Sequence, residues 1–440
     1  MLSARNPVPA VADRYRAVFD ARWQGDDPLV ALRRAALEQF LSAGFPTQRQ
    51  EDWKYTNLRR LETRTFALTE TSALDASQPE WLATTGTRIV LANGHWLPAL
   101  SSQPAAQPPG VTILTLKQWL QREPAEVAAY LAEHGQLGGS ALEQLNLAFF
   151  EDGVVINLAD HVTLDEPVYV VHQWGNASAL RMSHPRIVVR AGRNSRATII
   201  EHYLGPAEAE YFTNAVTRID VAAGGAVKHF RLQQESPRSF HIGHVLAKLD
   251  RDARYSSHDL ALGAGLGRSD ITALLQGSGA HAALFGLFAP MGTQHLDAHT
   301  RIDHVAPNTT SEEDYRGIAG GRGRGVFNGK VIVRPGAQKI DARQSSRNLL
   351  LSPTAEIDTK PELEIYAHDV KCSHGATTGQ IDATALFYLR SRGLSESEAR
   401  GLLIRAFAES ILSTIDLAAL RTALERQIDE RFNLANEAQA

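Results

Sequence analysis

The chain has 440 residues, 45 of them basic and 49 acidic, and its formal net charge is −4 at pH 7. A chain of this length can bury a large core without disulfides or structural metals. The two signs of charge are mixed, which argues against nucleic acid and anionic membranes as partners. The single cysteine cannot form an intrachain disulfide, and no apolar run reaches the roughly 18 residues that span a bilayer. Because the N-terminus also lacks the apolar core of a signal peptide, we expect a cytoplasmic protein.

Residues 1–150 are expected to form a mixed, mostly helical region. Helical spacing of apolar residues predicts helices within 28–43, 115–135 and 140–153. Pro124 must break the second of these or begin a turn in it. The Pro- and Ser-rich stretch SSQPAAQPPG at 101–110 is typical of an exposed linker.

Residues 151–381 are expected to form a strand-rich core. The segment contains short apolar and β-branched runs such as GVVINL, PVYVVH and GKVIVR. Similar breaks between the runs, such as VRAGRNSRATII and IDVAAGGAVKHF, recur about every 27 to 32 residues, which is compatible with the rungs of a solenoid. A right-handed parallel β-helix fits best. A sandwich or jelly roll would also show many short strands, so the periodicity alone leaves that alternative open.

Helices are expected again over 382–440. Ser395, with Glu398 three residues later, matches a capping box at a helix start. An apolar face follows at four-residue spacing, formed by Leu403, Phe407, Ile411 and Ile415, and a second helix carries Leu420, Leu424 and Ile428. Two amphipathic helices at the end of a strand solenoid either cap it or dock a partner.

The glycine-rich stretch GGRGRGVFNGKV at 320–331 only resembles a phosphate-binding loop. Arg324 and Val331 stand where the Walker pattern requires Gly and Ser or Thr. We therefore expect no ATP site, and a tight turn between rungs instead.

Three histidines, at positions 295, 299 and 304, lie close together in the sequence, and imidazole is a common metal ligand. In a strand, His295 and His299 would be about 13 Å apart, too far to share one ion without a turn. Solvated histidines are the favoured interpretation. Since no nucleophile elbow or H-E-x-x-H helix is present either, self-contained catalysis has little support.

The stretch PELEIYAHDVKCSHG at 361–375 contains the only cysteine and reads as one extended segment. Alternation along a strand would place Glu362, Glu364, Cys372 and His374 on one face. Cys372 and His374 would lie about 6 to 7 Å apart at the backbone, close enough to bind one soft metal ion, or for an imidazolium to lower the thiol pKa. Two ligands make half of a tetrahedral site, so another chain would supply the remainder. A structural, buried Cys372 is the alternative.

Two stretches resemble signatures of a known family. TKPELEIYAHDVKCSHGATTGQID at 359–382 resembles the C-terminal signature of the SufB/SufD family, the scaffold proteins of the SUF iron–sulfur assembly system. FPTQRQEDWKYTNL at 45–58 resembles the N-terminal signature of the SufD branch, and the single cysteine also favours that branch over the cysteine-richer SufB. The resemblance spans nearly the whole chain and implies a β-helix core between helical flanks.

The resemblance implies partners and a role in cluster assembly. It implies pairing with SufB through the core, and docking of the ATPase SufC on the C-terminal helices at Leu403, Phe407, Ile411 and Ile415, with no ATP bound by this chain. His374 is implied to build a transient iron–sulfur cluster with a SufB cysteine, assisted by Cys372. ATP-driven dimerisation of SufC would then pull on residues 395–432 and expose both side chains to iron and persulfide sulfur.

Several alternatives stay open at this point. The resemblance also implies a role in iron acquisition. The complex could contain a reduced FAD, but the sequence indicates no residues that would bind it. The isolated chain could form a homodimer through the surface meant for SufB. Two rival functions are a purely structural subunit and a β-helix carbohydrate-active enzyme, which would act alone on a glycan.

Overall fold

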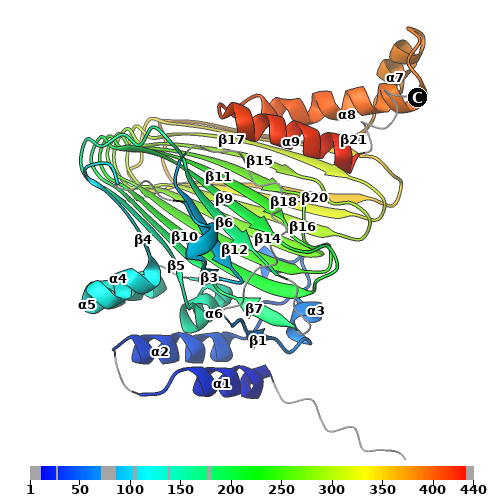
Figure 1. Ribbon diagram of the computed structural model, residues 1–440. Coiled ribbons are helices and arrows are strands. Elements are labelled where there is room, and N and C mark those ends of the chain that lie inside the picture. Colours follow the sequence, from blue (N-terminus) through cyan, green and yellow to red (C-terminus); the bar gives the residue numbers. More distant parts are fainter. Residues whose placement is uncertain are drawn as a thin grey trace, which may run out of the picture.

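Two large, facing β-sheets dominate the molecule, with helices outside both (Figure 1). The computed structural model describes residues 11–25, 28–70, 86–102, 107–136, 139–175 and 180–432. From β8 onward, successive strands alternate between the two sheets.

The 11-stranded sheet contains, in spatial order, β20 (Glu356–Ile365), β18 (Arg324–Val333), β16 (His295–His304), β14 (Leu266–Leu275), β12 (Phe240–Leu249), β10 (Tyr211–Val221), β8 (Arg186–Ala191), β5 (Gly153–Leu158) and β4 (Val111–Thr115), while β7 (Arg181–Ser183) joins β10 to β1 (Ala67–Leu68). The 10-stranded sheet contains β21 (Val370–Gln380), β19 (Ile340–Leu350), β17 (Thr310–Ala319), β15 (His281–Phe288), β13 (Arg254–Ala261), β11 (Ala226–Gln234), β9 (Arg196–Leu204), β6 (Val168–Gln173), β2 (Arg88–Ala92) and β3 (His95–Trp96).

The strands build a parallel β-solenoid. Phe212 is paired with Phe240, and Arg324 with Glu356, both in parallel, so one coil takes about 30 residues, as the spacing of the turns predicts. The predicted solenoid core is thereby confirmed, and the sandwich alternative is wrong because neighbouring strands of the main coils run parallel. Antiparallel pairs join β4 to β5 and β3 to β2.

Alternation along each strand separates an inner from an outer face. Side chains between the sheets, such as Val245, Ile271 and Ala298, form the central core. We call the space between the two sheets the lumen. It contains polar as well as apolar side chains, and Glu201, His229 and Glu313 are almost fully buried there.

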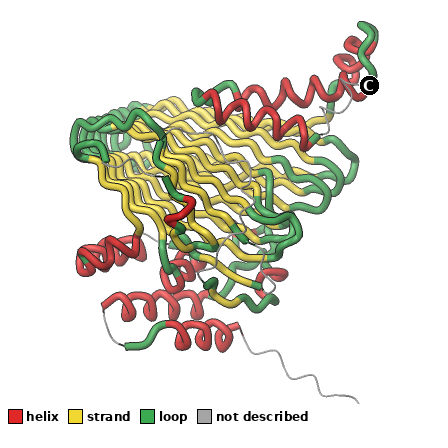
Figure 2. The backbone as a smooth tube through the Cα atoms, viewed as in Figure 1, coloured by secondary structure: helices red, strands yellow, loops and turns green. Residues whose placement is uncertain are grey.

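Helices cover both outer faces, as the red segments of Figure 2 show. The N-terminal region contributes α1 (Val11–Arg22), α2 (Pro28–Ala43), η1 (Glu51–Trp53), α3 (Arg59–Glu62), η2 (Pro98–Leu100), α4 (Leu116–Arg122), α5 (Pro124–Gln136) and α6 (Ala141–Phe149). Residues of α1, α2 and α6 share a core with Phe212 and Phe240 of the 11-stranded sheet. The C-terminal helices are α7 (Ala383–Arg390), α8 (Glu396–Leu412) and α9 (Ala418–Arg431), and α8 and α9 pack on the 10-stranded sheet.

Most predicted helices are confirmed. The helix over 28–43 forms as α2, and Pro124 separates α4 from α5. The description of the first 150 residues as mostly helical missed β2 and β4, which pair with β6 and β5 and so extend both sheets. In the predicted linker at 101–110, Ser102 instead bridges to Arg88, and residues 103–106 lie outside the described residues.

The glycine-rich stretch at 320–331 is a turn followed by a strand, as predicted. Gly323 donates a backbone hydrogen bond to Gly320, and Gly321 has a φ of 64°. The strand β18 then begins at Arg324. None of the helices within the described ranges is both long and apolar enough to cross a membrane.

Candidate functional site

The last coil of the solenoid, formed by β20 and β21, leaves the end of the lumen open. These are the terminal strands of their sheets, and among the described residues each pairs on one side only, with β18 and β19. The other edge of each strand therefore presents unpaired backbone donors and acceptors. Every residue of both strands is half-buried or exposed, whereas β19 and β18 are largely buried. We call this part of the molecule the open coil.

The segment 361–375 is not one strand, so the prediction that Glu362 and Glu364 share a face with Cys372 and His374 is wrong. The chain turns at residues 366–369 and crosses from one sheet to the other. Glu362 lies on the outer face of the 11-stranded sheet, where it accepts a hydrogen bond from Asn328. Cys372 and His374 belong to the 10-stranded sheet and face the lumen, because their register partners Ala342 and Gln344 do so.

Cys372 is half-buried and packs against the central core. Burial raises the pKa of its thiol, and the negative charge of Asp341 raises this pKa further. This is the reverse of the lowering expected from a neighbouring imidazolium. The thiol is therefore largely protonated at neutral pH until a metal ion or a base removes the proton.

His374 follows two residues later on the same face and is exposed. Its register partner in β19 is Gln344, which is buried, with 4% of its surface exposed. Thiol and imidazole thus lie side by side at the mouth of the lumen. No group of three His, Cys, Asp or Glu side chains within the described ranges has a geometry that could hold a metal ion.

The predicted apolar face of α8 is split between two environments. Ile411 in α8 and Ile415, which lies beyond the end of this helix at Leu412, are buried against the 10-stranded sheet. Within this chain they therefore belong to a cap and do not lie on an open docking face. Leu403 and Phe407 are half-buried and line a cavity of about 310 Å³ together with Thr378 and other residues at the end of β21. The capping box at Ser395 and Glu398 is confirmed.

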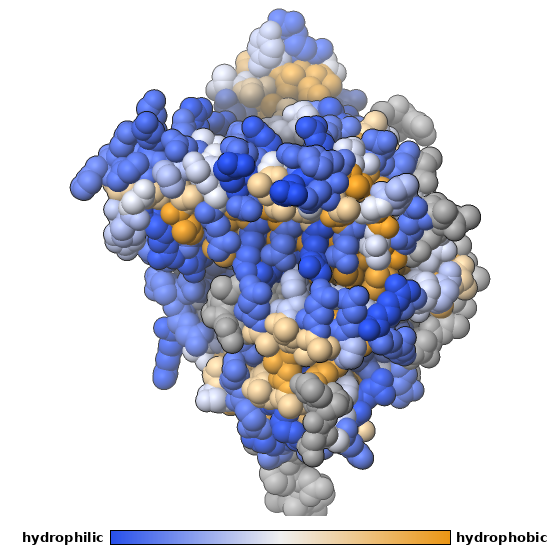
Figure 3. Space-filling view, turned by 90° about the vertical axis from the view of Figure 1, so that its left-hand side faces the viewer, coloured by the Kyte–Doolittle hydropathy of each residue, from blue (hydrophilic) through white to orange (hydrophobic). Residues whose placement is uncertain are grey.

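An exposed apolar surface lies next to this cavity, on α7 and the outer side of α8. Phe387 is 74% exposed, Tyr388 56% and Leu402 46%. We call these three residues the α7–α8 patch. Hydrophobic atoms are visible at the highest part of the molecule in Figure 3, where α7 projects. Asp382 caps α7 two residues after β21 ends, so the patch and the open coil are joined by a short stretch of chain.

The N-terminal signature segment 45–58 docks on the outer face of the 11-stranded sheet. The sequence alone did not predict this contact. The guanidinium carbon of Arg268 lies 3.7 Å from the ring centroid of Trp53. Arg268 also donates to the carbonyl oxygen of Asp52 at 2.6 Å, and the Thr56 hydroxyl donates to the Asp297 carboxylate at 2.5 Å. The segment is therefore held by β14 and β16.

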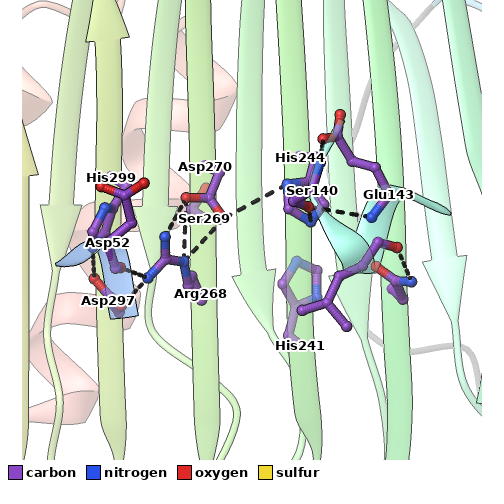
Figure 4. Close-up of polar contacts among 12 residues, drawn as sticks. Asp52, Ser140, Glu143, His241, His244, Arg268, Ser269, Asp270, Asp297 and His299 are labelled. Carbon is purple, nitrogen blue, oxygen red and sulfur yellow. Dashed lines mark hydrogen bonds and ion pairs between the residues drawn. The ribbon is translucent and has the colours of Figure 1, made fainter. Parts of the chain in front are cut away.

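Beside this segment, His244, Asp270 and His299 lie next to one another on β12, β14 and β16 (Figure 4). They line a cavity of about 300 Å³. Arg268 lies 2.7 Å from Asp270. Burial alone would raise the pKa of Asp270, but Arg268 holds this pKa below its usual value. The positive charge of Arg268 thus offsets the negative charge of Asp270 within the chain, which fits a role of these residues in anchoring the N-terminal segment.

The three clustered histidines are not solvated as expected. His304 is fully buried and hydrogen-bonded to Thr309 and Ser311 in the lumen. His295 contacts Thr56, and His299 lies 3.0 Å from Asp297. Strand alternation explains why these histidines are not on a solvated face. His304 faces the lumen, whereas His295 and His299 lie on the outer face under the N-terminal segment.

Comparison with known proteins gives consistent matches along the chain. Residues 20–170 match the profile described as the SufBD protein N-terminal region, and residues 173–407 match the SufBD core domain of SUF system FeS cluster assembly. The chain is 33% identical over 417 residues to an iron–sulfur cluster assembly SufBD family protein of Synechocystis, covering 92% of each chain. It is 32% identical over 401 residues to the iron–sulfur cluster assembly protein SufD of Escherichia coli, covering 90% of this chain and 91% of that one. A chloroplastic protein of Arabidopsis thaliana, ABCI7, is 27% identical over 393 residues, covering 88% and 82% of the two chains.

Proposed function

This chain belongs to the SufBD family of SUF-system iron–sulfur cluster assembly proteins and is a homologue of SufD, and we propose that it is a non-catalytic scaffold subunit which pairs with SufB and SufC. Its proposed task is to supply part of the site where a nascent cluster forms and to help acquire the iron. Membership of this family argues against the alternative function of a β-helix carbohydrate-active enzyme.

The observation that carries this proposal is the position of Cys372 and His374 at the open coil. A soft thiolate and an imidazole nitrogen are both suitable iron ligands. They lie at the mouth of the lumen, on a coil whose two strands each have one edge that no described residue pairs with. Ligands from a neighbouring subunit can reach them from that open side.

Pairing with SufB is supported by the same free edges. An unpaired strand edge accepts a further strand through backbone hydrogen bonds. Since both sheets end in the same coil, a partner that ends in a similar coil can extend both of them at once. Such pairing would bring a cysteine of SufB next to His374. In the absence of SufB, a second copy of this chain could pair through the same edges, so we propose that the isolated chain can form a homodimer.

In the proposed chemistry, iron is the substrate and the protein supplies ligands. His374 would bind iron through an unprotonated ring nitrogen. Cys372 would bind as a thiolate, and because burial raises its pKa, iron binding must displace the thiol proton. Cluster formation should therefore be faster at higher pH over the range in which this thiol titrates. A reduced flavin in the complex stays a prediction, with no residue of this chain assigned to it.

Docking of SufC is proposed on the α7–α8 patch, with Leu403 and Phe407 at its inner border. Exposed apolar surface of this kind is typical of a protein interface. ATP hydrolysis is assigned to SufC. A force on α7 and α8 would reach β21 through the short connection at residues 381–382 and through the cavity wall at Phe407 and Thr378.

The experiment that tests the proposal is co-expression with SufB and SufC, followed by anaerobic purification and a visible spectrum. His374→Ala should remove the cluster absorption while all three subunits still co-purify. His368→Ala is the matched control, because His368 is exposed and lies on the turn between the two terminal strands. Normal cluster formation in His374→Ala would favour the alternative of a purely structural subunit. The cytoplasmic location stays a prediction.

A further inference from the structure

The wall of the lumen directly below His374 is made by one buried amide side chain. His374 and Gln344 are register partners in the parallel strands β21 and β19, so their side chains project from the same face of the sheet at neighbouring positions. The pairing places Gln344 between His374 and the interior of the solenoid. Gln344 is therefore the nearest polar side chain of β19 that could hold the imidazole.

The amide of Gln344 is oriented by a buried carboxylate. Its Nε2 donates to Oε2 of Glu313 at 2.7 Å, and the other carboxylate oxygen of Glu313 accepts from the hydroxyl of Thr300. An ionised carboxylate can only accept hydrogen bonds, so above the pKa of Glu313, which burial raises to about 7, the NH₂ group of Gln344 must face Glu313. The carbonyl oxygen, Oε1, is then directed away from Glu313.

Oε1 of Gln344 is left without a partner. This atom is buried and makes no hydrogen bond among the described residues. Leaving a buried acceptor unsatisfied is costly, so the arrangement points to a donor that is missing from one conformation of the site. The imidazole N–H of the register partner is such a donor.

The opposite sheet leaves room for this amide. Gly329 of β18 faces the lumen, and a Cβ atom at that position would lie 1.8 Å from Nε2 of Gln344. Glycine is therefore required there for Gln344 to keep its present orientation. Four residues from four strands, Thr300, Glu313, Gly329 and Gln344, thus fix one acceptor atom beneath the open coil.

We propose that Gln344 is a positioning residue for His374: its Oε1 accepts the N–H of one imidazole nitrogen, so that the other nitrogen is left unprotonated and directed to the open end, where iron is bound. Metal-binding histidines usually donate their second ring nitrogen to such a partner, which fixes both the tautomer and the ring orientation. Glu313 acts through Gln344 by holding the amide in place. The inference rests on the proposed function, because a fixed tautomer of His374 matters for cluster assembly only if His374 binds iron.

The test measures the tautomer of His374 in the full chain without iron. The chain is labelled with ¹⁵N-histidine, two-bond ¹H–¹⁵N spectra are recorded at about pH 8.5, where imidazole is ordinarily neutral, and the signals are assigned with His374→Ala. Wild type should show one tautomer at His374, and Gln344→Leu should show the averaged shifts of a free histidine. Ser346→Ala is the control, because Ser346 is the next buried, lumen-facing residue of β19.

A second variant covers the case in which Gln344→Leu is unstable, since that change leaves the Glu313 carboxylate without one donor. The double variant Glu313→Leu with Gln344→Leu removes both partners, which is far less costly than removing one, and should give the same averaging. An averaged tautomer in wild type, or a single tautomer that survives in the folded variants, would overturn the inference.

The same variants separate this inference from the proposed function. In the complex with SufB and SufC, Gln344→Leu should slow the appearance of the cluster about tenfold or more. If His374→Ala leaves assembly unchanged, the proposed function fails whatever the tautomer. If His374→Ala abolishes assembly but the tautomer is averaged in wild type, only the role of Gln344 fails.

Discussion

The indole ring of Trp53 lies over the guanidinium group of Arg268, with 3.7 Å between the guanidinium carbon and the ring centroid. Trp53 belongs to the N-terminal signature segment and Arg268 to β14, more than 200 positions later in the chain. The stacked pair, together with the hydrogen bond from Thr56 to Asp297, fastens the N-terminal region to the solenoid. The signature therefore marks a structural contact, and its Glu51 also forms an ion pair with Lys360 of the open coil.

Replacing Trp53 by alanine should destabilise the protein strongly. Trp53 is buried, and truncating a buried tryptophan typically costs about 3 to 5 kcal/mol through lost burial, lost stacking and a cavity. The free energy of unfolding in urea is the measurement. Tyr55→Ala is the control, because Tyr55 lies in the same segment but is only half-buried. Equal losses in the two variants would show that the stacking on Arg268 is unimportant.

The stability contribution of Glu313 should depend on pH. Burial raises the pKa of this carboxyl from its ordinary value of 4.5 to about 7, although the hydrogen bonds from Thr300 and Gln344 act to lower it. Because the folded-state pKa is the higher one, the contribution is fully present below about pH 4.5 and is lost as the pH rises through 7. The shift corresponds to a loss on the order of 3 kcal/mol.

Glu313→Gln removes this titration, so its unfolding free energy relative to wild type should increase between pH 5 and pH 8. Denaturant unfolding at several pH values measures the difference, in which the titrations that both proteins share cancel. A difference that stays constant over this range would contradict the buried, titrating carboxyl. The variant also leaves the lumen uncharged at this position.

Ile411→Ala tests the capping role of α8. Ile411 is fully buried between α8 and the 10-stranded sheet, so the change should lower the unfolding free energy by about 2 to 5 kcal/mol. Leu402→Ala on the exposed side of the same helix should alter it by less than about 0.5 kcal/mol. If Ile411→Ala were as mild as Leu402→Ala, the helix would not be docked as described.

The α7–α8 patch should be required for binding SufC. Phe387→Asp combined with Leu402→Asp places two charges in the exposed apolar surface and should prevent co-purification of SufC, while the fold is kept. Val305→Asp is the matched control, because Val305 is also an exposed apolar residue, 43% exposed, but lies on a turn between β16 and β17. Normal recovery of SufC with the double variant would place its binding site elsewhere.

Local patterns predicted the elements well. The apolar spacing over 28–43 gives α2, the break at Pro124 gives two helices, and the turn spacing gives the coils of the solenoid. These features depend on neighbours within a few residues, or on a repeat of nearly constant length. The capping box at Ser395 succeeded for the same reason, because all its hydrogen bonds are local.

Features that depend on the third dimension could not be predicted in this way. The segment 361–375 reads as one strand, but the turn at 366–369 sends Glu362 and Cys372 to different sheets. Ile411 has the spacing of an interface residue, but whether the interface is internal or external depends on the sheet beneath it. The link from Gln344 to Glu313 joins two strands one coil apart, 31 positions along the chain, and no local pattern carries it.

In the proposed scaffold, this chain supplies an imidazole ligand to a cluster that another subunit completes. The most direct test is pulsed EPR on the reduced nascent cluster, formed anaerobically in a complex where only this chain carries ¹⁵N-histidine. We expect a ¹⁵N hyperfine coupling from one directly bound histidine, which persists in His368→Ala, whereas His374→Ala should yield no cluster. A wild-type cluster of normal yield that shows no ¹⁵N coupling, or a cluster that forms normally in His374→Ala, would contradict a ligand role for His374.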